Sequence, residues 1–155
     1  MDLEDKAIED KLTKQVSVFL ENKSGRLRDV CRALGEAGIN IRALCIADTS
    51  DFGILRLILD DPAQALEVLL EEGFSVGETT VLAVQIPDHP GGLGSVLHAL
   101  PDDTLNVEYM YAFFTRLEGK AVVVFRIADA QIPAVIQTME TAGVVIMPAA
   151  EVYAI

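Results

Sequence analysis

The stretch "VSVFLENKSGRLRDVCRALGEAGINI" at residues 16–41 has a counterpart in "LAVQIPDHPGGLGSVLHALPDDTLNV" at residues 82–107. In both stretches an alternating apolar segment leads to a polar turn with glycine, then to a helix-like segment, and then to Asn between aliphatic residues. Gly91 follows Gly25 by 66 positions, and the aliphatic residues around them keep the same phase. Chance rarely preserves such a pattern over so long a window, so the chain is predicted to hold two tandem domains.

The first copy predicts a complete order of strands and helices. The alternating, β-branched "QVSVFLE" is typical of a strand, and helical spacing of apolar residues predicts a helix over 24–38 that Gly38 ends. Strands are predicted in "INIRALCIAD" and "ILRLILD". A helix should follow with Asp61 as N-cap and Pro62 at its first position, and "FSVGETTV" supplies the last strand.

The resulting order, βαββαβ, is that of the split βαβ or ferredoxin-like sandwich, an α+β fold with an antiparallel sheet and both helices on one face. The second copy gives the same order, from a strand in "VLAVQIP" to a last strand in "VVIMPAAEVYAI". We therefore predict a short, acidic, helical lead-in at residues 1–12 and two domains at residues 13–79 and 80–155.

The parity of the strands predicts which side chains face the helices. In the first copy these should be Val16, Val18, Leu20, Ile41, Ala43 and Cys45. The opposite face should carry Phe19, Leu44, Ile46, Ile54 and Ile58 in the first copy, and Met110, Ala112, Phe114, Val122 and Val124 in the second. Such a face is too apolar to be left in water, so we expect the other copy or a second chain to cover it, and a homodimer to form.

Composition limits the classes of partner. The 155 residues include 24 acidic and 12 basic side chains, for a net charge of −12, which argues against nucleic acid and anionic membrane surfaces. No apolar run approaches the roughly 20 residues that span a bilayer, and the N-terminus lacks the apolar region of a signal peptide. Cys31 and Cys45 have no metal-like spacing and are interpreted as reduced, so a cytoplasmic protein without a metal or cofactor is expected.

The two polar turns are the candidate binding sites. Each leads into a helix N-terminus, where free backbone N–H groups favour an anion such as a carboxylate. Gly25 and Gly91 lack a Cβ, so a ligand can approach the backbone closely. Asn40 and Asn106 open the second strand of each copy, are expected near that turn, and offer both a donor and an acceptor. Asp88 could accept from an ammonium group, so the set would suit a small zwitterion.

A purely structural interpretation of the same residues stays open. Asn22 or Asp88 could simply cap the helix that follows, and the two later Asn residues could serve only the bend before a strand. The sequence contains no CxxC, HExxH, GxSxG or P-loop motif, so no catalytic site is predicted.

Both stretches resemble ACT domains, in which a first strand is followed by a D/N-x-P-G-x-L turn, a helix and an aliphatic-Asn-aliphatic strand start. The resemblance covers nearly the whole chain after residue 12. It implies a ligand-sensing module, usually for free amino acids, that pairs with another ACT domain and binds its effector at their interface. The site residues implied by the resemblance are Asn22, Ser24, Gly25, Leu27, Asn40, Asp88, Pro90, Gly91, Leu93 and Asn106. Ser24 stands where the family usually has proline.

The resemblance also implies how such a protein acts. Most family members append the module to a catalytic domain, and this sequence shows none. We therefore expect a regulatory protein, not an enzyme, that binds an amino acid or similar small zwitterion and acts through a partner such as a regulated enzyme. The alternative is an oligomerisation or protein-interaction module whose ligand site is vestigial.

Overall fold

The computed structural model describes residues 2–48, 51–100, 106–114 and 117–155. The chain divides into two compact units, a first unit that consists mainly of residues 14–79 and a second unit that consists mainly of residues 1–13 and 80–153. Each unit has an antiparallel sheet with helices, so the predicted α+β class is confirmed.

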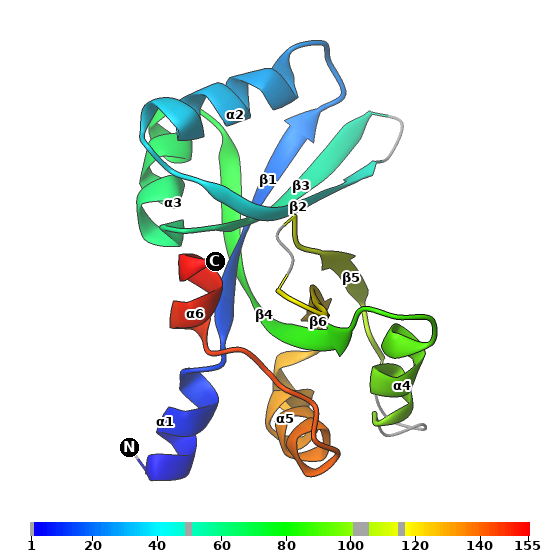
Figure 1. Ribbon diagram of the computed structural model, residues 1–155. Helices are drawn as coiled ribbons and strands as arrows, with labels where there is room; N and C mark the ends of the chain where they lie inside the picture. The colour runs from blue at the N-terminus through cyan, green and yellow to red at the C-terminus, as the bar shows by residue number, and fades with distance from the viewer. Residues whose placement is uncertain (1, 49–50, 101–105, 115–116) are drawn as a thin grey trace. The chain divides into compact units, whose positions relative to one another are not determined.

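The first unit has the strand order of a ferredoxin-like sandwich, β2-β3-β1-β4 (Figure 1). Both β1 and β2 run antiparallel to β3, so β1 and β2 are parallel to each other. The chain passes in order through β1 (Thr13–Glu21), α2 (Arg26–Glu36), β2 (Ile41–Asp48), β3 (Phe52–Leu59), α3 (Pro62–Glu71) and the first part of β4 (Ser75–Pro87). As predicted, Pro62 begins α3, and the Asp61 side chain accepts a hydrogen bond from the N–H of Gln64 at 3.0 Å.

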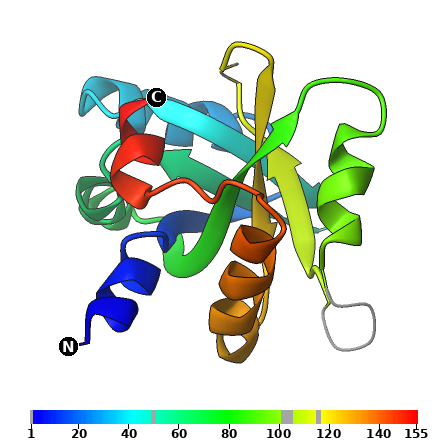
Figure 2. The same cartoon turned by 60° about the horizontal axis from the view of Figure 1, so that its bottom comes forward.

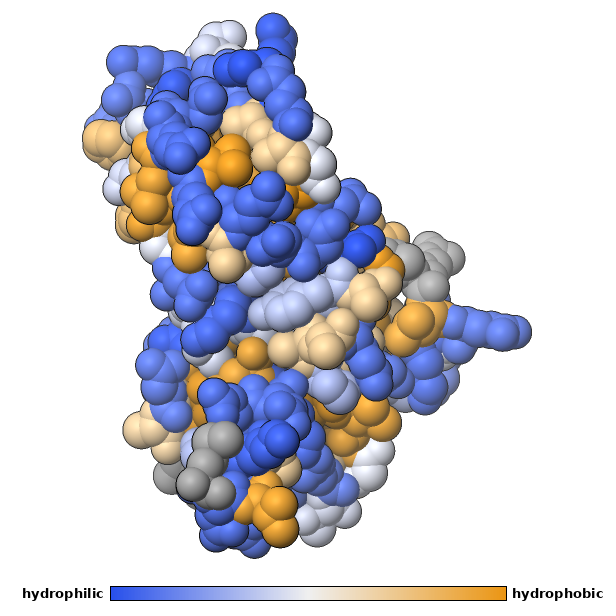
Figure 3. All heavy atoms as spheres, turned by 90° about the vertical axis from the view of Figure 1, so that its left-hand side faces the viewer, coloured by the Kyte–Doolittle hydropathy of each residue, from blue (hydrophilic) through white to orange (hydrophobic). Residues whose placement is uncertain are grey.

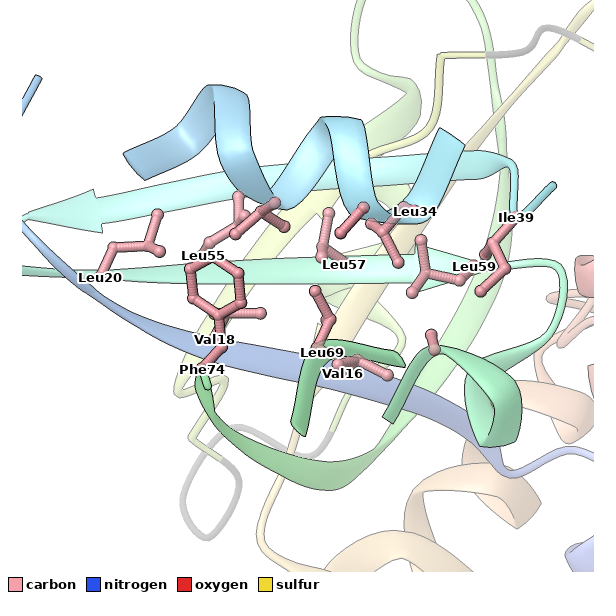
Figure 4. Close-up of a cluster of buried hydrophobic side chains, with 13 residues drawn as sticks. Val16, Val18, Leu20, Leu34, Ile39, Leu55, Leu57, Leu59, Leu69 and Phe74 are labelled. Carbon is pink, nitrogen blue, oxygen red and sulfur yellow. The ribbon is translucent and has the colours of Figure 1, made fainter. Parts of the chain in front are cut away.

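The core of the first unit lies between its sheet and its two helices (Figure 4). Alternate residues of β1, namely Val16, Val18 and Leu20, point toward the helices as predicted and are at most 5% exposed. Leu34 of α2 and Leu69 of α3 close over them. Burying each side chain of this size contributes about 1.5–3 kcal/mol, so the alternation in β1 is a main source of the unit's stability.

The predicted alternation is wrong in β2. A register shift between Ile41 and Ala43 changes which face each later residue occupies. Ile41 and Leu44 both pack against the core, and Ile46 pairs with the core residue Leu55. Directly paired residues share a face of an antiparallel sheet. Ala43 and Cys45, which pair with Ile58 and Arg56, therefore lie on the opposite face, while Leu44 and Ile46 lie on the helix side. Phe19 and Ile54 pair with each other on the opposite face, as predicted.

The second unit repeats this order with the strands β4-β6-β5. Its elements are α1 (Leu3–Glu9), the remainder of β4, α4 (Gly92–His98), β5 (Tyr109–Ala112), β6 (Lys120–Arg126), the 3-10 turn η1 (Asp129–Gln131), α5 (Ile132–Thr141) and α6 (Ala149–Ala154). The strands that we predicted before and after residues 79–81 are one continuous strand, because β4 extends over 13 residues without a break.

The predicted last strand of the second copy is wrong. Only a single bridge, between Val84 and Ile146, replaces it, and Figure 2 shows the segment that leaves α5 and leads to α6. The flanking hydrogen bonds join the Gln85 N–H to the Val145 carbonyl (2.9 Å) and the Met147 N–H to the Ala83 carbonyl (2.8 Å). Pro148 then ends the pairing, because it has no N–H to donate and its φ of −58° suits the start of a helix.

The alternation expected in β5 is also wrong. Met110 packs against the core of the second unit, and Ala112 pairs with the core residue Val123, so both lie on the helix side. Phe114 lies beyond the end of the strand and is 65% exposed. Val122 and Val124 do lie on the opposite face, since their neighbours Val123 and Phe125 point into the core. In both units the alternation fails just after the Asn that precedes the second strand.

The N-terminal segment packs on the second unit. α1 is capped by Asp2, whose side chain accepts from the N–H of Leu3 at 2.6 Å. Ile8 and Leu12 pack against the core of this unit, and Lys11 forms an ion pair with Glu140 of α5. The segment is thus part of the second unit, although it precedes the first unit in the sequence.

The surface is mostly polar where Figure 3 displays it. Hydrophilic residues predominate on this face, and apolar residues gather in several separate groups. None of the helices in the described ranges is both long and apolar enough to cross a membrane.

Arg126 ties together three segments of the second unit. Its guanidinium donates to the carboxylates of Asp129 (2.7 Å) and Glu108 (3.2 Å) and to the carbonyl of Thr80 (2.9 Å). Partial burial of the guanidinium opposes its charge, but the hydrogen bond to Asp129 and the two acidic neighbours outweigh burial and raise the pKa of Arg126 above its ordinary value.

Replacement of Arg126 should destabilise the protein. Arg126→Gln leaves the Thr80 carbonyl and two carboxylates without their donor, so the free energy of unfolding should fall by about 1–3 kcal/mol. Chemical denaturation measures this loss. The matched control is Arg28→Gln, because Arg28 is exposed on α2 and makes no hydrogen bond or ion pair to another described residue. An equal effect of the two substitutions would contradict this role.

The start of α4 requires glycine for a steric reason. A Cβ on Gly92 would lie 1.9 Å from the carbonyl oxygen of Pro87, which is far inside contact distance. Gly92→Ala should therefore lower the free energy of unfolding by about 1–3 kcal/mol, as overpacking does. Gly94→Ala, two residues later in the same helix, has open space for its methyl group and should leave stability unchanged or raise it by about 1 kcal/mol. Thermal unfolding of the two variants compares them directly.

Candidate functional site

The two turns have the same backbone conformation. The helix N-caps are Gly25 (φ 90°) and Gly91 (φ 84°), both in the left-handed region that favours glycine. Each glycine carbonyl accepts the first helical hydrogen bond, at 2.9 Å, from Asp29 in the first turn and from Ser95 in the second. The repeat seen in the sequence is thus a repeat of one strand-turn-helix geometry.

Among the described residues, no side chain caps either of these helices. The interpretation that Asn22 or Asp88 serves as the cap is therefore wrong. In the first turn, the N–H groups of Leu27 and Arg28 make no hydrogen bond to another described residue. Helix N-termini of this kind leave donors and a partial positive charge available to an anion.

A cavity of about 120 Å³ lies beside the first turn. It is lined by Leu20, Glu21, Asn22, Lys23, Arg26, Leu27, Ile46 and Gly53. Its walls come from the end of β1, the start of α2, and the ends of β2 and β3 that face this turn. The lining combines apolar side chains with charged groups of both signs, which is the composition that a small zwitterion needs.

The charged groups of this cavity are partly paired with each other. Lys23 Nζ lies 2.6 Å from a Glu21 oxygen, and the hydrogen bond and positive charge of Lys23 lower the pKa of Glu21. Arg26 lies 3.7 Å from Asp29, and its guanidinium carbon lies 4.6 Å from the ring centre of Phe74. The cavity therefore carries one carboxylate and two cations, with one cation already held by the carboxylate.

Several lining residues were not among the predicted site residues. Glu21, Lys23 and Arg26 lie within the turn sequence, so their charge alone could have indicated them. Ile46 and Gly53 come from β2 and β3, and only the strand register brings them to the turn. Ser24, a predicted site residue, lies in this turn and is exposed, although it does not line the cavity.

The second turn is built more tightly. The backbone of Gly92 approaches the Pro87 carbonyl so closely that a side chain is excluded. The Asp88 N–H donates to the Gly119 carbonyl at 3.2 Å, and the Leu93 side chain packs against the core. Pro90 and the Asp88 carboxylate are exposed, and this carboxylate has no hydrogen bond or ion pair to another described residue. The geometry therefore favours the first turn over the second as a binding site.

Asn40 does not lie near the first turn, contrary to expectation. Its N–H donates to the Asp60 side chain at 2.9 Å and its carbonyl accepts from the Asp60 N–H at 3.1 Å. The turn, by contrast, is level with the other end of β3, where the Asn22 N–H donates to the Asp51 carbonyl at 3.0 Å. Because β1 and β2 are parallel, the end of β1 and the start of β2 lie at opposite ends of the sheet.

Asn106 is separated from the second turn in the same way. The Asp88 N–H bonds near the start of β6, at Gly119, whereas the Glu108 N–H bonds at its end, to the Arg126 carbonyl. Neither unit therefore brings its own turn and its own Asn together. Among the described residues, no group of three or more His, Cys, Asp or Glu side chains could hold a metal ion.

Comparison with known proteins agrees with this architecture. The family model described as an ACT domain pair matches residues 12–143. Protein BT0572 from Bacteroides thetaiotaomicron, a solved crystal structure, is 38% identical, with a TM-score of 0.85 over 94% of this chain and 98% of that chain.

Two more distant structures share the fold. The regulatory subunit of aspartate kinase from Thermus thermophilus, in its ligand-free form, is 16% identical, with a TM-score of 0.61 over 86% of this chain and 95% of that chain. The corresponding subunit from Thermus flavus is 20% identical, with a TM-score of 0.57 over 84% and 92%. No curated protein matches the sequence. Because the family match covers most of the residues and both units have the ferredoxin-like order, the chain belongs to the ACT domain pair family.

Proposed function

We propose that this ACT domain pair is a regulatory protein that binds a free amino acid at the first turn. The main support for this proposal is the N-terminus of α2, which has no side-chain cap among the described residues and lies beside a cavity with charged groups of both signs. The similarity to regulatory subunits of aspartate kinase supports a regulatory role. Because their sequence identity to this chain is low, the ligand is inferred from the residues of this chain alone.

The cavity suggests how an amino acid would be held. Its carboxylate would accept from the N–H groups of Leu27 and Arg28, where the helix dipole adds to the attraction. Its ammonium group would compete with Lys23 for the Glu21 carboxylate, and this exchange would free Lys23 to approach the ligand's carboxylate. The small volume, about 120 Å³, favours a short side chain, packed against the apolar wall that includes Ile46.

A second copy of the chain would complete the site. β2 is the edge strand of the first unit and is hydrogen-bonded, among the described strands, only to β3, so its outer edge can pair with another strand. If two β2 strands pair antiparallel about a two-fold axis, the start of each lies level with the end of the other. Asn40 of the second copy would then lie beside Ile46 and the first-turn cavity. In this arrangement Asn22 of one copy and Asn40 of the other copy would contact the same ligand, although the two residues lie far apart within one chain.

Regulation would follow from this shared site. A ligand that contacts both copies binds the dimer and not the separated chains, so it stabilises the dimer by mass action. The signal would pass to a partner, such as a regulated enzyme, through the surface that the paired copies present. A purely structural dimer is the second candidate, because Ile46 is 46% exposed on the edge strand and could support pairing without any ligand.

Amino-acid binding should depend on both Asn residues. A thermal-shift screen of the standard amino acids should identify one that raises the unfolding temperature, since binding at 100 times Kd adds about 2.7 kcal/mol. With that amino acid, Asn22→Ala and Asn40→Ala should each weaken binding roughly tenfold, as for the loss of one or two hydrogen bonds. Gln64→Ala, on the exposed side of α3, is the control and should bind normally.

Calorimetry with these variants, and the screen itself, can each contradict the proposal in a distinct way. Weaker binding only for Asn22→Ala would place the ligand at the turn but reject the contribution of a second copy. Normal binding in both variants would reject the site. A screen with no hit would favour the structural dimer.

Dimerisation through β2 should be sensitive to charge on its edge. Ile46→Lys places a cation where the two strands would meet, and it should shift the protein to monomers in sedimentation-velocity experiments at micromolar concentration. Leu70→Lys makes the same change at a residue of α3 that is 58% exposed, and it should leave the dimer intact. A dimer that resists Ile46→Lys but not Leu70→Lys would show that α3, and not β2, forms the interface.

A further inference from the structure

A larger cavity, of about 470 Å³, lies in the second unit and includes none of the residues considered so far as ligand-binding. It is formed by the end of β4, the outer part of α4, the start of β6 and the segment that follows α5. Its lining residues are Gln85, Pro87, Ser95, Val96, His98, Ala99, Lys120, Ala142, Gly143, Val144 and Val145. A volume of this order is typical of small-molecule sites.

The charge of this cavity is unusual for the chain. The protein has 24 acidic residues against 12 basic ones, yet no Asp or Glu among the described residues lines the cavity, whereas Lys120 and His98 do. Within the part of the chain that the structure describes, the side chains of Lys120, His98 and Gln85 make no hydrogen bond or ion pair. The cavity therefore has three polar side chains with free donors, one of them a cation, and no carboxylate of the described residues pairs with that cation.

The first unit shows what fills the equivalent place. His98 repeats Arg32 at an offset of 66, and Ala142 repeats Glu72 at an offset of 70, the offset that also relates Gly143 to Gly73. In the first unit, Arg32 lies 3.9 Å from Glu72 and so joins α2 to the end of α3. In the second unit, alanine replaces the acidic partner, and the space between the two helices stays open.

We propose that this cavity binds a small monocarboxylate with an aliphatic body. The ligand's carboxylate takes the place that the Glu72 side chain has in the first unit, where His98 and Lys120 can donate to it. An imidazole donates through one ring nitrogen in either of its neutral tautomers. The aliphatic body packs against Val96 and Val144, and the small side chain of Ala99 leaves the room for it. The ligand needs no ammonium group, which separates this site from the one at the first turn.

The test uses 4-methylpentanoate as the probe, with chemical-shift changes in the backbone amides of the full-length protein as the readout. We expect saturable chemical-shift changes on addition of 4-methylpentanoate, concentrated at residues 96–99, 120 and 142–145. Acetate has the charge without the aliphatic body, and 4-methylpentanamide has the body without the charge, so each should bind at least about tenfold more weakly. Equal binding of either compound, or shifts centred elsewhere, would overturn the proposal.

Two substitutions test the mechanism of recognition. Ala142→Glu, on an exposed position, restores the carboxylate of the first unit and should abolish binding by occupying the ligand's place. Lys120→Gln should weaken binding about five- to tenfold through loss of a charge-assisted hydrogen bond. The control is Lys6→Gln, which makes the same charge change on the exposed face of α1 and should alter Kd less than about twofold. Unchanged binding in Ala142→Glu would overturn the proposed position of the carboxylate, whether or not amino acids bind at the first turn.

Discussion

The parallel relation of the first and second strands in each unit determines where everything else can lie. The helix between two parallel strands must carry the chain back along the sheet, so the turn after the first strand and the start of the second strand are at opposite ends. The same topology leaves β2 at the edge of the first unit, where β3 is its only neighbour among the described strands. A turn site and the Asn of the following strand can therefore meet only through another ACT unit, and the edge strand is where such a unit can be added.

The two units share one fold, but their cavities lie in different parts of it. In the first unit the turn is bordered by a cavity with Glu21, Lys23 and Arg26, while an ion pair joins the two helices. In the second unit Gly92 closes the turn against Pro87, while the space between the helices forms the larger cavity. Duplication followed by a few substitutions at equivalent positions is sufficient to produce this difference, because the buried residues that define the fold are nearly the same in kind.

Local patterns in the sequence were sufficient for most of the fold, and features that depend on pairing were not. Strand alternation identified β1 and its buried face, and the Asp61-Pro62 pair located the start of α3. The register shift after Ile41 leaves no local signal, since the residues on both faces of β2 are apolar. The last strand of the second copy was predicted wrongly because the prediction did not take account of Pro148, which precedes α6. The separation of Asn40 from the turn follows from topology, and the order of elements would have been enough to predict it.

Net charge and local charge have opposite consequences for an anionic ligand of this protein. The net charge of −12 repels a carboxylate at long range, but salt screens such repulsion beyond about 8 Å at physiological ionic strength. Within that distance, fixed donors determine where an anion binds. These are the backbone N–H groups at the start of α2 and side chains such as Lys120, which is paired with no carboxylate of the described residues. At least six of the 12 basic side chains, including Lys11 and Arg126, are paired with carboxylates in the structure. A donor without such a partner that also lines a cavity, as Lys120 does, therefore marks a place where an acidic protein of this family can still receive an anion.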